Sequence, residues 1–141
     1  MGIIFDLNQT IIDAGIALNA IENGDWKTAC DLIPQMTPYT EVVDLIHELA
    51  NSGTEVAVVT SSPRDYCEKV LNTLGITGVI TVCYEDTSQH KPYPQPYLFA
   101  MKQMKNQQRE KIIAVGDEEY DLIAAYYAHI ECALANWCNN D

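Results

Sequence analysis

Four short runs of apolar residues recur along the chain, and helical patterns separate them. The runs are Gly2–Phe5, Val56–Val59, Val79–Cys83 and Ile112–Val115, and a weaker fifth run is Cys132–Ala135. They are rich in isoleucine and valine, which is typical of strands buried on both faces of a parallel sheet. Strands and helices in alternation fold through right-handed crossovers. We therefore predict an α/β fold: a three-layer, doubly wound, Rossmann-like parallel sheet of about five strands.

Amphipathic patterns between these runs predict the helices. One helix is expected over 40–51, where four apolar residues share a face that we expect to lie on the core. These residues are Val42, Leu45, Ile46 and Leu49. A second helix is expected between Ser62, as its N-cap, and Gly75, where it ends. Two more are expected over about 96–105 and 119–129.

Length and charge restrict the class of protein. The 141 residues fit a single domain over 1–141, with a short helical insert at about 13–39. Eight basic against twenty acidic residues give a formal charge of −12. Phosphate-rich polymers and anionic membrane surfaces would be repelled, so we expect no nucleic acid and no membrane as a partner. A local phosphate site then requires a metal ion or backbone N–H groups.

The cysteines and the N-terminus indicate a reducing, cytoplasmic location. Five cysteines occur without a C-x-x-C pair, and we interpret them as small apolar residues. They are Cys30, Cys67, Cys83, Cys132 and Cys138. No apolar run has the length of a membrane span, and the start MGIIFD lacks the pattern of a signal peptide.

The insert carries apolar side chains that allow two interpretations. Ile16, Ile21 and Trp26 either pack on the core or form an exposed patch for a partner or a substrate. Because the insert is short, we expect it to leave the site open unless a protein partner or a second copy of the chain covers it.

Polar residues follow the predicted strands at their carboxyl ends, where ligands of open α/β sheets collect. They are Asp6 and Asn8, then Thr60 and Ser61, then Lys91, then Asp117 and Asp121. Carboxylates suit Mg²⁺, hydroxyl and N–H groups bind phosphoryl oxygens, and an ammonium neutralises transition-state charge. Alone, each residue has a structural explanation, such as a helix cap for an acid. Together they indicate phosphoryl chemistry.

Four segments in order resemble the motifs of the haloacid dehalogenase (HAD) superfamily, in particular its phosphoglycolate phosphatase-like branch. They are GIIFDLNQT, VAVVTSSP, HKPYPQPYLFA and IIAVGDEEYDLIAA. The resemblance covers nearly the whole chain and implies a Mg²⁺-dependent phosphatase with a much reduced cap. It implies that Asp6 is the nucleophile and becomes an aspartyl phosphate. Around the phosphoryl group it places Thr60, Ser61 and Lys91. Around Mg²⁺ it places Asp6, Asn8, Asp117 and Asp121.

Asn8 departs from the first motif, where the family has a second aspartate that protonates the leaving group and activates water. An amide cannot exchange a proton in this way, although its main-chain carbonyl can still face the metal. We expect slowed turnover of a phosphorylated substrate that the sequence does not identify. The alternative is a pseudo-enzyme that keeps the fold and serves as a binding or regulatory module.

Overall fold

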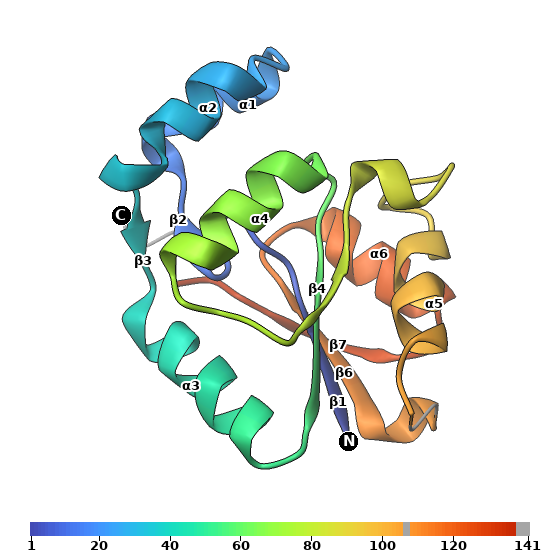
Figure 1. Ribbon diagram of the computed structural model, residues 1–141. Helices are drawn as coiled ribbons and strands as arrows, with labels where there is room; N and C mark the ends of the chain where they lie inside the picture. The colour runs from blue at the N-terminus through green and yellow to red at the C-terminus, as the bar shows by residue number, and fades with distance from the viewer. Residues whose placement is uncertain (106–107, 138–141) are drawn as a thin grey trace.

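The computed structural model describes residues 1–105 and 108–137, and its centre is a five-stranded parallel sheet (Figure 1). The strand order is β5-β4-β1-β6-β7. The strands are β1 (Gly2–Phe5), β4 (Glu55–Val59), β5 (Ile80–Val82), β6 (Ile112–Gly116) and β7 (Glu131–Leu134). Every predicted apolar run overlaps one of these strands, which confirms the predicted fold class. The order reverses at β1, so the ends of β1, β4 and β6 form the ligand edge.

Helices cover both faces of the sheet (Figure 1). They are α3 (Thr40–Asn51), α4 (Arg64–Thr73), α5 (Gln95–Lys102) and α6 (Glu119–Tyr127). Phe5 and Val58 pack in one buried cluster with residues of α3 and α4, whereas Ile4 packs in a second cluster with residues of α5 and α6. Successive residues of a strand thus enter opposite cores, and both faces need apolar side chains.

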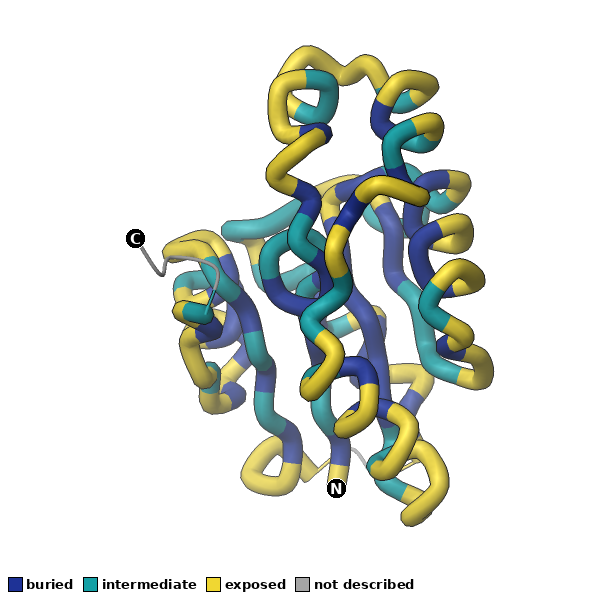
Figure 2. The backbone as a smooth tube through the Cα atoms, turned by 90° about the vertical axis from the view of Figure 1, so that its left-hand side faces the viewer, coloured by how far each residue is buried: buried dark blue, intermediate teal, exposed yellow. Residues whose placement is uncertain are grey.

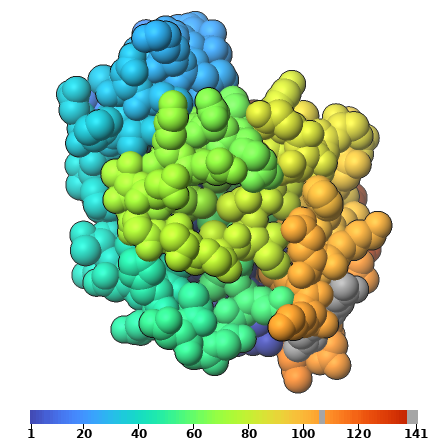
Figure 3. Space-filling view, in the orientation of Figure 1, coloured from blue at the N-terminus to red at the C-terminus, as the bar shows by residue number. Residues whose placement is uncertain are grey.

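The segment after β1 contains the short elements expected for the insert. They are β2 (Ile12–Asp13), a 3₁₀ turn (Gly15–Ala17), α1 (Leu18–Glu22), α2 (Trp26–Leu32), a 3₁₀ turn (Ile33–Gln35) and β3 (Thr37–Pro38). Figures 2 and 3 show this insert projecting beyond the main body. Trp26 packs against the Tyr66 ring of α4 with 5.2 Å between centroids, and Ile21 also contacts the core. Ile16 is 53% exposed, so core packing is confirmed for Trp26 and Ile21 but not for Ile16, and a partner or substrate at Ile16 stays a prediction.

Two details differ from the predicted helices. Ser62 is not the N-cap of α4, because the helix begins at Arg64 and Pro63 takes the cap position. The Arg64 N–H instead donates to Glu85 Oε1 at 2.9 Å. On α3 the fully buried residues are Val43 and Ile46, whereas Leu45 is 44% exposed. The predicted core face of α3 is therefore confirmed for Val42, Ile46 and Leu49, which pack on the core, and is wrong for Leu45.

The remaining 3₁₀ turns are Tyr84–Asp86 and Arg109–Lys111.

The described cysteines are free thiols: Cys67 and Cys83 are buried, and Cys30 and Cys132 are half-buried. Cys138 lies outside the described residues. Among the helices of the described chain, none has the length and apolar character needed to cross a bilayer.

Candidate active site

Three carboxyl groups from distant parts of the chain meet at the ligand edge of the sheet. Asp6 follows β1, Asp117 follows β6, and Asp121 lies in the first turn of α6. The Asp6 N–H donates to Val115 O at 2.9 Å, which fixes the end of β1 against the end of β6. Each of the three residues offers a carboxylate oxygen, and these oxygens all lie within 4.8 Å of one another. The structure thus brings together three of the predicted metal ligands.

Lys91 lies between two of these acids. Its Nζ is 3.1 Å from Asp6 Oδ1 and 2.6 Å from Asp121 Oδ1, and its side chain is only 6% exposed. Burial alone would lower the pKa of Lys91, but the two carboxylates outweigh burial and raise the pKa. Lys91 therefore stays charged at the centre of the site, as its predicted phosphate-binding role requires.

Asp121 is held by groups that the sequence did not identify as site residues. Its Oδ2 accepts the Glu118 N–H at 3.1 Å, and its Oδ1 accepts the Tyr97 hydroxyl at 3.4 Å. A Cβ at Gly116 would lie 2.4 Å from the Asp121 carboxyl, so only glycine fits there. Tyr97 is the aromatic residue that closes the segment KPYPQPY, and this position was the available signal. Asp121 is thus oriented mainly to hold Lys91.

Asn8 is held at both ends of its amide group. Its Oδ1 accepts the Tyr66 hydroxyl at 2.7 Å, and its Nδ2 donates to Ser62 Oγ at 3.3 Å. Gln9, in the same turn, has a left-handed φ of 65°, which is uncommon for a residue with a side chain. The sequence did not single out Tyr66, and it offered Ser62 only as a helix cap. Their contact with Asn8 joins α4 and the end of β4 to the turn after β1.

The predicted phosphate-binding hydroxyl groups lie at the end of β4, beside the end of β1. Thr60 is 6% exposed, and its Oγ1 accepts the Ser62 N–H at 3.1 Å. The Thr60 hydroxyl still has its own proton to donate to another acceptor. Ser61 is exposed in the same turn. The structure therefore orients Thr60 and leaves Ser61 open to solvent.

The charges around Asp6 and Asp117 do not balance. Burial raises the pKa of Asp6 although Lys91 opposes the shift. Burial, followed by the hydrogen bond and the charge of Asp6, raises the pKa of Asp117 to about 8. Three acidic residues and one ammonium give the cluster an excess of negative charge. The atoms that it offers to a metal ion are hard carboxylate oxygens. This donor set fits Mg²⁺, which prefers carboxylate oxygens.

We expect Asp117→Asn to stabilise the metal-free protein most at about pH 8. Between the ordinary value of 3.8 and about 8, folded Asp117 binds a proton that the unfolded chain has released. Wild-type stability therefore falls as pH rises across this range, and the amide removes that dependence. Thermal melting in chelator should show a larger gain in melting temperature at about pH 8 than at about pH 5. A gain that is equal at both values would contradict the assigned shift.

The parallel sheet and the acid–lysine cluster at its carboxyl edge define a Rossmann-like α/β core with a candidate catalytic site. The family model described as haloacid dehalogenase-like hydrolase matches residues 23–135. The chain belongs to this family.

Comparison with curated proteins supports the same placement. Pyrophosphatase PpaX of Oceanobacillus iheyensis is 26% identical over 75% of this chain and 50% of its own. Validoxylamine A 7'-phosphate phosphatase of Streptomyces hygroscopicus subsp. limoneus is 32% identical over 71% of this chain and 47% of its own. Phosphoglycolate phosphatase of Colwellia psychrerythraea is 30% identical over 66% of this chain and 42% of its own. The chain thus spans half or less of the length of these relatives.

Solved structures share the fold. A hydrolase from Pseudomonas syringae superposes with a TM-score of 0.80 and 18% identity, over 100% of this chain and 87% of that chain. CbbY from Rhodobacter sphaeroides superposes with a TM-score of 0.78 and 16% identity, over 93% of this chain and 84% of that chain.

Proposed function

We propose that the chain is a Mg²⁺-dependent phosphohydrolase that acts through an aspartyl phosphate on Asp6. The observation that carries this proposal is the position of Lys91 Nζ, 3.1 Å from the Asp6 carboxylate, with the Asp117 carboxyl in the same cluster. An ammonium and a buried carboxylate side by side suit attack on an anionic phosphoryl group. Relatives named as phosphatases and pyrophosphatases support the same chemistry.

In this mechanism the Asp6 carboxylate attacks phosphorus, and the bond from phosphorus to the leaving oxygen breaks. Thr60, Ser61 and Lys91 bind the phosphoryl oxygens as charge redistributes. Water then attacks the aspartyl phosphate, which releases inorganic phosphate and restores the carboxylate.

Four residues would hold the Mg²⁺ ion in this proposal. Asp6 and Asp117 would hold the ion with their carboxylates and Asn8 with its main-chain carbonyl, whereas Asp121, whose two oxygens already accept hydrogen bonds, would support the ion or its waters. When bound, the ion neutralises the repulsion between Asp6 and an anionic substrate.

Asn8 restricts the substrates that can turn over. With no proton to give at this position, a leaving group departs as an anion, so it must be a weak base. Acyl phosphates and phosphoanhydrides meet this condition, whereas alkyl phosphate esters do not. We propose a substrate from the first two classes.

The second candidate function is a pseudo-enzyme that binds phosphorylated ligands without turnover. The observation that favours it is the Asn8 amide itself, which Tyr66 and Ser62 hold in place of the expected acid. The two functions differ in metal-dependent turnover.

The deciding experiment measures phosphate release from acetyl phosphate and p-nitrophenyl phosphate with Mg²⁺, and again after chelation. We expect saturable release that chelator abolishes and added Mg²⁺ restores, with acetyl phosphate the faster substrate. Release that survives chelation would contradict the proposed metal site. Mg²⁺ binding by calorimetry without any release would favour the pseudo-enzyme.

A further inference from the structure

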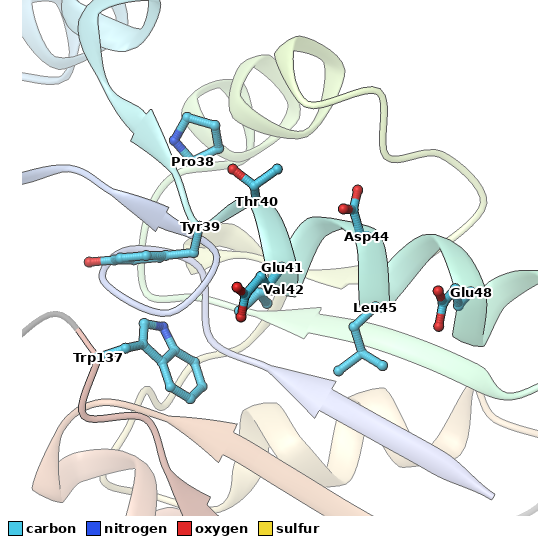
Figure 4. Close-up of a pocket in the computed structure, with 9 residues that line it drawn as sticks. All are labelled: Pro38, Tyr39, Thr40, Glu41, Val42, Asp44, Leu45, Glu48 and Trp137. Atoms are coloured by element: carbon cyan, nitrogen blue, oxygen red, sulfur yellow. The ribbon is translucent and has the colours of Figure 1, made fainter.

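A groove of about 820 Å³ lies along one side of α3, and none of its lining residues belongs to the acid–lysine cluster (Figure 4). Glu41, Val42, Leu45 and Glu48 line it from α3, and Trp137 lies opposite, on the segment after β7. The groove therefore separates the third helix from the end of the described chain.

Each wall of the groove presents an apolar side chain, and one of these two side chains is fixed in position. Leu45 is 44% exposed, although a leucine on this face of α3 is expected to be covered. Trp137 donates its indole N–H to Thr10 O at 3.1 Å and packs edge-on against Tyr39, with 6.5 Å between centroids. The groove is thus preformed, which lowers the entropic cost of filling it.

Part of the sheet on the α3 side, at β6 and β7, is only partly covered by the described residues. Ile113 and Val115 of β6 are half-buried, and Val115 contacts the core on the side of α3 and α4. On β7, Ala133 is exposed and alternates with Cys132, which packs on the α6 side. In residues 1–105 and 108–137, α5 and α6 pack on the opposite face, so Ile113, Val115 and Ala133 form a partly exposed apolar strip on the α3 side of the sheet.

An acidic line runs beside the apolar wall. Glu41, Asp44 and Glu48 occupy positions i, i+3 and i+7 of α3, so they lie on one side of the helix. Within the described part of the chain, none of the three forms a salt bridge of 4.0 Å or less. A second copy of this chain, with a formal charge of −12, would bring like charges together here.

We propose that this groove binds an amphipathic helix of a partner protein, whose apolar face is flanked by lysine or arginine. The apolar residues of the partner cover Leu45, Trp137 and the strip of β6, and its cations pair with Glu41 and Glu48. A helix fits because the adjacent α3 already covers the sheet in the same layer. This inference is independent of the proposed catalytic activity.

The test uses three fluorescent helical peptides, each of about 18 residues so that a helix is long enough to form. The first carries leucine on one face and lysine on its flanks, the second replaces lysine by glutamate, and the third scrambles the first. Fluorescence anisotropy measures binding to wild type, to Leu45→Lys, to Glu41→Lys/Glu48→Lys, and to a control of equal charge, Glu22→Lys/Glu110→Lys. The control residues are exposed and lie outside the groove. Circular dichroism verifies that each variant is folded.

We expect wild type and the control variant to bind the leucine–lysine peptide in a 1:1 complex, and to bind the scrambled peptide at least about tenfold more weakly. Leu45→Lys should weaken binding by a similar factor, and the groove charge reversal should shift preference to the leucine–glutamate peptide. If Glu41→Lys/Glu48→Lys and the control Glu22→Lys/Glu110→Lys lose affinity for the leucine–lysine peptide equally, the proposal is overturned, because the attraction is then non-specific. Self-association of wild type that Leu45→Lys abolishes would overturn it in favour of a second copy.

Discussion

Asn8→Asp accelerates hydrolysis of an alkyl phosphate ester by about 10²–10⁴-fold, the usual contribution of a positioned general acid–base group. The reason is local geometry: Tyr66 and Ser62 hold the side chain at position 8, and both can also hold a carboxylate. The Ser62 hydroxyl, which now accepts from the amide, can turn and donate to the acid. The measurement is kcat/KM for β-glycerophosphate and for acetyl phosphate, in wild type and variant.

The control for this gain is its dependence on the leaving group. Acetyl phosphate, whose leaving group needs no proton, should gain much less than the alkyl ester, and Asn8→Ala should gain with neither substrate. If both substrates accelerate equally, Asn8→Asp acts on metal or phosphate binding, and the interpretation of Asn8 as a missing acid is wrong.

Lys91→Met lowers turnover of acetyl phosphate by about 10²–10³-fold, the range for loss of one transition-state donor. Its ammonium contacts Asp6 and Asp121, and its removal leaves two buried acids without their cation. Breaking such a buried pair costs about 3–5 kcal/mol of folding stability in other proteins. Urea unfolding should therefore show a loss of stability together with the loss of activity.

Tyr97→Phe separates these two effects. The Tyr97 hydroxyl also contacts Asp121, at 3.4 Å, but it carries no charge. Its loss should cost less than about tenfold in turnover and about 1 kcal/mol in stability, the usual net value of one hydrogen bond. Equal activities of Lys91→Met and Tyr97→Phe in folded protein would show that the charge of Lys91 does not serve the reaction.

The fold was predictable because its central strands, β1 and β4, are largely buried on both faces. In β4, each side chain of Val56–Val59 is buried in one of the two cores, so few residue types fit and the sequence pattern is strong. The sequence pattern is weaker evidence for which face of a helix packs on the core. Leu45 fits the predicted core face of α3, yet the described chain leaves it 44% exposed, in the groove that α3 and Trp137 line.

Part of the candidate site was also predictable, because the strands that carry its residues are recognisable in the sequence. Asp6, Lys91 and Asp117 follow strands or lie in motif segments, and parallel strands bring such residues to one edge. The residues that orient them were not predictable in this way. Tyr66 looks like an ordinary buried helix residue, and only the packing of α4 beside β1 puts its hydroxyl 2.7 Å from Asn8. Asp121 resembles a first-turn acid of a helix until its contact with Lys91 is seen.

The most direct test of the central claim is to trap the phosphorylated protein. Wild type, mixed with acetyl phosphate and Mg²⁺ and quenched in acid, is digested and analysed by mass spectrometry. The account predicts one added phosphoryl group on Asp6 and none in Asp6→Asn. The same adduct on another residue, or an Asp6→Asn protein that releases phosphate at the wild-type rate, would contradict it.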